Sequence, residues 1–341
     1  MSRKKIILGI ESSCDDTSAA IISNGFILSN IVANQKVHEK YGGVVPELAS
    51  RAHQQNIIPV VDTAINEAGI TKEDLSAICF TQGPGLLGSL LVGSSFAKSF
   101  ALGMNIPLIA VNHMQGHIMA HFIKEEGTDN RQPRFPFLCL TVSGGHTQIV
   151  LVKSIENMTV IGETLDDAAG EAFDKSAKIL GLHYPGGPLI DKYGKDGNKL
   201  KFIFGKHKVG ALNFSYSGIK TSILRVIEKE VAENPNFIEE NLNDLCASIQ
   251  HTIVDILIKK IMKASKELEI NEIAIAGGVS ANSYLRSRLL ELKEKHHKEV
   301  YIPKFEYCTD NAAMIAISGY YKFLEGKFAE QSINPKSRFA L

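Results

Sequence analysis

Two apolar runs on either side of a polar turn begin the chain. Lys5–Ile10 is almost wholly apolar, which is typical of a buried strand, and Ser18–Ile22 repeats this character a few residues later. The residues between them, Glu11–Asp16, are serines, acids and one cysteine. The pattern therefore predicts a strand, a polar turn and a second strand.

The same pattern returns in the middle of the chain. Phe137–Val142 predicts a strand, Ser143–His146 a polar glycine turn, and Thr147–Val152 another strand. The two copies lie about 130 residues apart. A duplicated hairpin of this kind indicates two similar lobes that face each other across a cleft.

Helices alternate with further strands in the rest of the chain. A helical pattern runs from about Glu47 to Ala68 and ends at Gly69, a residue suited to helix termination. The remaining expected elements are strands at Ala77–Phe80, Pro107–Val111 and Glu272–Ala276, a glycine-rich loop at Thr81–Gly88, and helices to about Leu102, after Val111, and from about Ala281 to Leu292. Such alternation predicts an α/β fold with partly parallel sheets.

Composition adds limits to this picture. The 341 residues suit two lobes, and the five scattered cysteines, with no CxxC pair, indicate reduced core thiols. The basic start precedes an apolar run too short for a signal peptide, and no other run is expected to span a membrane, so a cytoplasmic protein is predicted. The formal net charge of zero argues against nucleic-acid binding through bulk charge, but it allows a local basic patch.

Three strand ends lead into turns rich in glycine, serine or acid. These are Glu11–Asp16, Ser143–Gly145 and Gly277–Ser280. Glycine turns after strands let backbone N–H groups approach phosphate oxygens closely, although each one alone is more often an ordinary tight turn. Together they resemble the phosphate and adenosine motifs of the actin, Hsp70 and sugar-kinase superfamily. The predicted fold class is therefore α/β, a duplicated actin-like two-lobed fold with a central cleft. Its N-terminal lobe is expected at 1–111 plus 311–341 and its C-terminal lobe at 112–310.

Two histidines at helical spacing suggest a metal site. His113 and His117 lie on one face of the expected helix, so both imidazoles can reach one ion, whereas His121 lies about 12 Å along the axis from His113. Met114 stands where a zinc peptidase of the HExxH type has its glutamate, which argues against that chemistry. Asp310 is a candidate third ligand, with an N-cap of the following helix as its alternative role.

Acidic and glycine residues also gather in a third region. Asp166–Asp174 begins a helix, where acids are usually explained by the helix dipole, and Tyr184–Asp191 follows with the glycines Gly186 and Gly187. The functional alternative is that these carboxylates bind sugar hydroxyls of a nucleotide while the glycine backbone packs against it.

Taken together, the motifs identify the chain as similar to one family over nearly its whole length. It resembles the tRNA N6-adenosine threonylcarbamoyltransferase (TsaD) family, once described as glycoproteases or O-sialoglycoprotein endopeptidases. The resemblance rests on Gly9–Ile21, Gly83–Ser89, Asn112–His117, Val142–Gln148, Asp167–Asp174, Tyr184–Pro188, Asn213–Lys220, Gly277–Asn282 and Cys308–Asn311.

The resemblance implies a reaction and a set of residues. The threonylcarbamoyl group of threonylcarbamoyl-AMP, made by a separate synthase, passes to N6 of the adenosine next to the anticodon in tRNAs that read codons beginning with A, and AMP is released. One Fe²⁺ or Zn²⁺ per subunit is expected on His113, His117 and Asp310. The expected substrate-binding residues are Thr141, Val142, Ser143, Gly144, Gly145, Asp174, Gly187, Asp191 and Asn282.

Other parts of the chemistry stay open at this stage. Glu11 and Asp16 are both candidates for the base that accepts the adenine N6 proton. Thr141 marks the bacterial branch, since archaeal and eukaryotic relatives are expected to have a metal-binding tyrosine there, and the fourth metal ligand is unassigned. The resemblance also implies two protein partners, an inactive paralogue (TsaB) and a small ATPase (TsaE). Lys195–Lys208 is a basic stretch that is either a solvated loop or part of a shared tRNA surface.

Two other functions compete with the transferase. An actin-like ATPase or sugar kinase fits the three turns equally, but has no need of the His113, His117 and Asp310 group. A non-catalytic subunit of the same complex would be free to lack that group.

Overall fold

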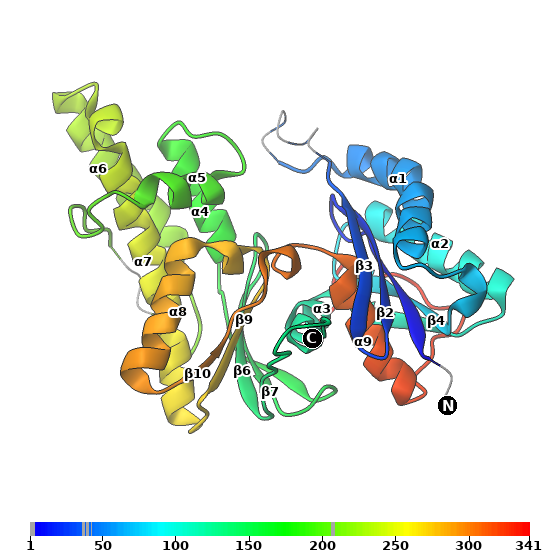
Figure 1. Ribbon diagram of the computed structural model, residues 1–341. Helices are drawn as coiled ribbons and strands as arrows, with labels where there is room; N and C mark the ends of the chain where they lie inside the picture. Colours follow the sequence, from blue (N-terminus) through cyan, green and yellow to red (C-terminus); the bar gives the residue numbers. More distant parts are fainter. Residues whose placement is uncertain (1–3, 36–37, 39–40, 42, 206–208) are drawn as a thin grey trace. The chain divides into compact units, whose positions relative to one another are not determined.

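The chain forms two compact units. The computed structural model describes residues 4–35, 38, 41, 43–205 and 209–341; Figure 1 shows its elements. Unit 1 comprises Met1–Gln132 and Pro303–Leu341, and unit 2 comprises Pro133–Ile302. The expected N-terminal lobe, 1–111 plus 311–341, lies wholly within unit 1, which also includes 112–132 and 303–310. These extra segments stay with unit 1 because the helix that begins at His113 packs against the last helix of the chain, where Gly116 approaches Ile315.

Unit 1 is built on a five-stranded mixed sheet with strand order β3-β2-β1-β4-β5. β1 pairs antiparallel with β2 and parallel with β4, so the opening hairpin of the sequence lies at the middle of the sheet. The strands are β1 (Ile6–Glu11), β2 (Thr17–Ser23), β3 (Phe26–Ala33), β4 (Ala77–Gly83) and β5 (Leu108–Asn112).

Unit 2 repeats this topology, which confirms the duplication predicted from the two hairpins. Its five-stranded sheet has the order β10-β9-β6-β7-β8, with β6 antiparallel to β7 and parallel to β9. The strands are β6 (Phe137–Val142), β7 (Thr147–Val152), β8 (Met158–Glu163), β9 (Glu272–Ala276) and β10 (Glu299–Tyr301). β6, β7 and β9 begin and end at the residues predicted from their apolar runs.

The helices of unit 1 cover both faces of its sheet. Alternate residues of β1, including Leu8 and Ile10, pack against α1 and α2, while Gly9 contacts α9 on the other face. The helices are α1 (Pro46–Glu67), α2 (Leu87–Met104), α3 (His113–Met119) and α9 (Ala312–Leu324), with short 3₁₀ turns at Lys72–Asp74, Ala120–Phe122 and Phe305–Tyr307. The predicted loop Thr81–Gly88 is shorter than expected because β4 continues to Gly83, which still pairs with Asn112.

The helices of unit 2 share one large apolar core with its sheet. Leu140, Phe173, Ile253 and Leu289 are all buried in it. The helices are α4 (Ala169–Ile179), α5 (Gly186–Gly194), α6 (Ser217–Glu233), α7 (Phe237–Glu267) and α8 (Ser283–His296), with a 3₁₀ turn at Gly278–Ala281. This turn delays α8 by two residues relative to the predicted start near Ala281.

One helix corrects the expectation that no stretch is long and apolar enough to cross a membrane. α2 passes that test by length and composition, with Lys98 its single charged residue. Core helices of soluble proteins pass the same test, and α2 buries Leu90, Gly93 and Ala97 against the rest of unit 1. All five cysteines are free thiols, as predicted.

Helix α9 approaches the sheet closely at a glycine. A Cβ atom on Gly9 would lie 2.6 Å from the Ala312 carbonyl oxygen and 2.7 Å from the Ala316 nitrogen. Backbone atoms cannot give way as the end of a side chain can, so any larger residue would push α9 away from β1. Gly9 therefore sets the distance between the strand that ends at Glu11 and the helix that follows Asp310.

We predict that Gly9→Ala lowers the free energy of unfolding by about 1–3 kcal/mol because it overpacks this contact. Urea unfolding followed by circular dichroism measures the change. Gly103→Ala is the matched control, since its new methyl group would meet no atom within 4 Å inside α2. The control should be neutral or slightly stabilising, by up to about 1 kcal/mol. Equal stability of the two variants would contradict the close-packing argument.

Candidate metal centre and ligand-binding turns

Three side chains of unit 1 converge as the histidine spacing predicted. Asp310 Oδ1 lies 3.4 Å from His113 Nε2 and 3.2 Å from His117 Nε2. Both histidines are buried, and the nearest ligand atoms of the three residues all lie within 4.8 Å of one another. His121 lies in the 3₁₀ turn after α3 and is not a member of this group.

Two asparagines fix the helices that present these ligands. Asn112 caps α3, because its side-chain oxygen accepts hydrogen bonds from the Met114 and Gln115 amides. His113 is therefore the first helical residue, and His117 follows one turn later on the same face. Asn311, not Asp310, caps α9 by accepting a hydrogen bond from the Met314 amide. The alternative role considered for Asp310 thus belongs to its neighbour.

Residues of the sheet hold the start of α9 as well. The Ala312 amide donates to Ser18 Oγ at 2.8 Å, and the Ala313 amide donates to Asn30 Oδ1 at 3.3 Å. Both acceptors come from the antiparallel strands β2 and β3. The position of the Asp310 carboxylate is therefore determined by sequence elements nearly 300 residues away from it.

The spacing of the three groups fits a transition metal. In a tetrahedral zinc site with bonds of about 2.0–2.1 Å, neighbouring ligand atoms are about 3.3 Å apart. The two Nε2–Oδ1 distances of 3.4 and 3.2 Å match this value. Two imidazole nitrogens and one carboxylate also suit Zn²⁺ or Fe²⁺ better than Mg²⁺, which prefers oxygen ligands. The donor set present in unit 1 is therefore suited to one such ion.

Glu11 lies directly behind His113. Its side chain is fully buried, and Oε2 is 3.1 Å from His113 Nδ1. Thr81 Oγ1 donates to the same oxygen at 2.6 Å, and the Ser13 amide donates to Oε1. This contact was not predictable from local patterns, because Glu11 and His113 are 102 positions apart and the sheet brings β1 beside the β5–α3 junction.

Carboxylates on both sides of His113 control its protonation. Burial alone would lower the pKa of this imidazole, but the charges of Asp310 and Glu11 and the Glu11 hydrogen bond raise it to about 9. Burial likewise opposes ionisation of Glu11, yet His113 and Thr81 bring its pKa below the ordinary value. Since a metal ligand must present a free nitrogen lone pair, binding of an ion at neutral pH should release a proton from His113.

Asp16 differs from Glu11 in its surroundings. It is half-buried, and Asn34 Nδ2 donates to its Oδ1 at 3.0 Å. Burial and the nearby charges of Asp15, Asp310 and Glu11 raise the pKa of Asp16 to about 7. Of the two candidate bases, Asp16 has the pKa closer to neutrality and the more accessible carboxylate.

The glycine turns of unit 2 lie together at the ends of β6 and β9. These strands are parallel neighbours, so Thr141 pairs with Ala276 and their following turns meet. Gly277 adopts a φ of +88°, and a Cβ there would lie 2.5 Å from the Val142 carbonyl oxygen. Gly144 and Gly145 are exposed, and a Cβ on either would meet no atom within 4 Å. Their backbone thus faces open space next to Ser143.

The start of α4 packs onto the same turn. The Gly170 amide donates to the Ser143 carbonyl oxygen at 3.2 Å, and Ser143 Oγ accepts a hydrogen bond from the His146 amide. Thr141 and Val142 are buried in β6, where Thr141 Oγ1 contacts the Gln148 carbonyl. Within the predicted segment 141–145, Gly144 and Gly145 are therefore exposed, and the buried strand residues Thr141 and Val142 support the turn.

The remaining predicted residues organise helix starts nearby. Asp174 Oδ1 accepts hydrogen bonds from the Gly186 and Gly187 amides at the start of α5, and burial raises the pKa of Asp174. Both oxygens of Asp191 bond to Ser283, and Asn282 caps α8 while it donates to Gln250 Oε1. Ser283 and Gln250 are partners that the sequence did not reveal.

Comparison with known proteins identifies the family. The family model "TsaD: tRNA N6-adenosine threonylcarbamoyltransferase" matches residues 26–317. A protein of that name from Christiangramia forsetii is 62% identical over 99% of this chain and 99% of its own length. Proteins of the same name from Phocaeicola vulgatus and Thermosipho africanus are 62% and 49% identical, over 95% and 96% of this chain and 95% and 97% of their own lengths.

Solved structures resemble the fold at much lower identity. Full-length HypF in its phosphate- and nucleotide-bound form matches with a TM-score of 0.62 at 13% identity, over 96% of this chain and 48% of its own. Component A of the Acidaminococcus fermentans (R)-2-hydroxyglutaryl-CoA dehydratase matches with a TM-score of 0.51 at 15% identity, over 94% of this chain and 99% of its own. These likenesses support the predicted actin-like fold. These sequence matches place the chain in the tRNA N6-adenosine threonylcarbamoyltransferase (TsaD) family.

Proposed function

We propose that His113, His117 and Asp310 hold one divalent metal ion, Fe²⁺ or Zn²⁺, and that this centre serves the reaction of the family. The convergence of three ligand atoms at metal-site spacing is the single observation on which the proposal rests. Mg²⁺-dependent kinases of similar fold have no need of such a group. The group therefore favours the transferase over an actin-like ATPase or kinase, and over a non-catalytic subunit.

The activity is that of a tRNA N6-adenosine threonylcarbamoyltransferase, an acyltransferase. The expected donor, threonylcarbamoyl-AMP, is a mixed anhydride, so its leaving group AMP is already activated. When bound, a metal ion polarises carbonyl or phosphate oxygens and stabilises the charge that develops there. The residues of the chain must supply binding of the adenylate, its orientation, and removal of the N6 proton.

We assign adenylate binding to the turns of unit 2. The Ser143 amide donates to the His146 carbonyl oxygen, so the backbone N–H groups of Gly144 and Gly145 are the ones that suit phosphate oxygens, because glycine leaves the approach open. Oδ1 of Asp174 is occupied by the Gly186 and Gly187 amides, so its Oδ2 is the atom we assign to a ribose hydroxyl. Asp191, on α5, and Asn282 support this assignment by holding the start of α8 in place.

Asp16 is the base we assign to the N6 proton. A base works best when its pKa lies near the operating pH, and Asp16 meets this condition with a pKa of about 7. The oxygens of Glu11 are engaged by Ser13, Thr81 and His113, which leaves this carboxylate poorly placed to accept a proton from a substrate.

A tRNA substrate also bears on the expected partners and on where the enzyme works. We expect the enzyme to work in the cytoplasm with TsaB and TsaE, sharing one tRNA surface among the subunits. A chain with a net charge of zero must contact RNA through local patches. Part of the basic stretch Lys195–Lys208 is one such patch; its residues 206–208 lie outside the described structure.

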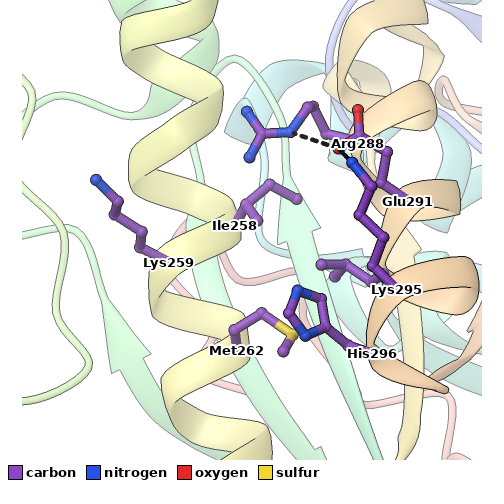
Figure 2. Close-up of a pocket in the computed structure, with 8 residues that line it drawn as sticks. Ile258, Lys259, Met262, Arg288, Glu291, Lys295 and His296 are labelled. Atoms are coloured by element: carbon purple, nitrogen blue, oxygen red, sulfur yellow. Dashed lines mark hydrogen bonds and ion pairs between the residues drawn. The ribbon is translucent and has the colours of Figure 1, made fainter.

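A pocket between α7 and α8 extends this basic patch. Ile258, Met262 and Leu292 form the apolar part of its lining. Lys259 on α7 and Arg288, Lys295 and His296 on α8 complete the lining. Figure 2 shows Glu291 paired to Arg288 and Lys295, whereas Lys259 points away from these residues and pairs with Asp255. Lys199, from the basic stretch, lies 5.3 Å from the ring of Tyr284, one turn before Arg288. We assign this series of cations to tRNA phosphates.

We predict that His117→Ala loses both the metal ion and the activity. Removal of a ligand should weaken metal binding by more than about 100-fold, which is the upper range for mutation of groups that only orient a ligand. Metal content is measured on purified protein, and product by nucleoside mass spectrometry after reconstitution with tRNA, threonylcarbamoyl-AMP and the expected partners. His121→Ala, a neighbouring histidine outside the group, should retain both. Full activity of His117→Ala without bound metal would contradict the proposal.

Asp16→Asn should reduce kcat by about 100-fold while metal content stays normal. Because the base must be unprotonated, wild-type kcat should rise with pH through about 7, the pKa of Asp16. This acid limb should vanish in Asp16→Asn. Asp15→Asn removes a charge that raises the pKa of Asp16, so it should move the limb to lower pH. A pH profile that is the same in Asp16→Asn and wild type would exclude Asp16 as the base.

The double variant Lys259→Ala/Lys295→Ala should weaken tRNA binding by the reconstituted complex. The slope of log affinity against log salt concentration should fall by about one to two, since each phosphate contact contributes about one. Lys229→Ala/Lys266→Ala is the control with the same loss of charge on exposed positions of α6 and α7. Equal effects of the two double variants would show that the pocket between α7 and α8 has no specific role.

A further inference from the structure

The geometry points to Glu11 as the positioning residue that selects which nitrogen of His113 is available to the metal ion. The inference rests on the metal centre proposed above. Glu11 contacts the ligand His113 from behind and does not itself belong to the group formed by His113, His117 and Asp310.

Three contacts determine the role of each Glu11 oxygen. The Ser13 backbone amide can only donate, so Oε1 must be an acceptor. Thr81 Oγ1 donates to Oε2 at 2.6 Å, and His113 Nδ1 lies 3.1 Å from the same oxygen. An ionised carboxylate is acceptor-only, so the proton of this last contact belongs to Nδ1 of His113.

The consequence appears on the opposite side of the ring. With its proton on Nδ1, the neutral imidazole has its lone pair on Nε2. Nε2 is the atom that faces Asp310 Oδ1 at 3.4 Å, where the ion is expected. Ser13 Oγ, 3.2 Å from Nδ1, can accept from the same N–H and so supports the same tautomer. The arrangement is the carboxylate–histidine–metal pattern that orients ligands in known metal sites.

His117 has no such support. Its Nε2 also faces Asp310 Oδ1, but its Nδ1 is buried without a hydrogen-bond partner in the described structure. Glu11 therefore acts on one of the two histidine ligands and not on the other. This asymmetry makes Glu11 separable by experiment from a general effect on the folding of unit 1.

Glu11→Gln tests the inference because it reverses the hydrogen bonds to Thr81 and His113 with little change of shape. The Ser13 amide holds the oxygen of the new side chain, so the amide nitrogen is directed at Thr81 and at His113 Nδ1. That nitrogen donates, so His113 must accept on Nδ1 and place its proton on Nε2. The variant should then disfavour coordination even though its volume is unchanged.

The measurement is Zn²⁺ binding to the full chain after the metal has been removed with a chelator. We expect Glu11→Gln to bind Zn²⁺ about 10- to 100-fold more weakly than wild type, by competition with a chromogenic chelator. Glu272→Gln is the control, since Glu272 is a buried carboxylate that pairs with Arg134 in unit 2, and its affinity for Zn²⁺ should equal that of wild type. Nitrogen-15 NMR of histidine-labelled, Zn²⁺-loaded protein should show a protonated Nδ1 for His113 in wild type.

A second variant covers the case in which Glu11→Gln does not fold. Thr81→Val removes the hydroxyl that holds Oε2 and should weaken Zn²⁺ binding several-fold, while Thr81→Ser should restore it. Unchanged affinity in Glu11→Gln, or in Thr81→Val if Glu11→Gln is unfolded, overturns the role of Glu11. Failure of wild type itself to bind Zn²⁺ at His113 and His117 would instead overturn the metal centre.

Discussion

The convergence of His113, His117 and Asp310 depends on the close contact between α9 and the sheet of unit 1. His113 and His117 are neighbours on one helix and need only a cap at Asn112 to be aligned. Asp310 has no local reason to lie beside them. It arrives there because Gly9 admits the backbone of α9 against β1, and because Ser18 and Asn30 accept hydrogen bonds from the first amides of that helix.

The two copies of the duplicated fold differ in the residues at the end of their first strand. In unit 1, β1 ends at the fully buried Glu11, which contacts His113, and the turn after it contains the half-buried Asp16. In unit 2, the corresponding turn is Ser143–Gly145, which exposes backbone and has no acid. The first copy therefore has carboxylates at this strand end, whereas the second has open glycine backbone. The equivalent strand order of the two sheets supports both arrangements.

Local patterns predicted most of the fold, whereas contacts between distant residues were beyond them. The apolar runs of β6, β7 and β9 and the turns beside them were enough to predict the boundaries of these strands, and the spacing of His113 and His117 indicated their common face. The cap of α9 is Asn311, not Asp310. Asparagine and aspartate are about equally good N-caps, so the residue types alone could not decide between the two positions. The role of Glu11 required the pairing of distant strands, and the apolar character of α2 was underestimated because small residues such as Gly93 and Ser94 interrupt its runs.

Crystals of the full chain grown with Zn²⁺ offer the most direct test of the proposed metal centre. Anomalous diffraction at the zinc edge locates the ion independently of any assumption about its ligands. We expect one strong peak in unit 1, coordinated by Nε2 of His113, Nε2 of His117 and a carboxylate oxygen of Asp310. A peak bound elsewhere, or none at these residues in protein that is otherwise folded as described, would contradict the proposed metal centre.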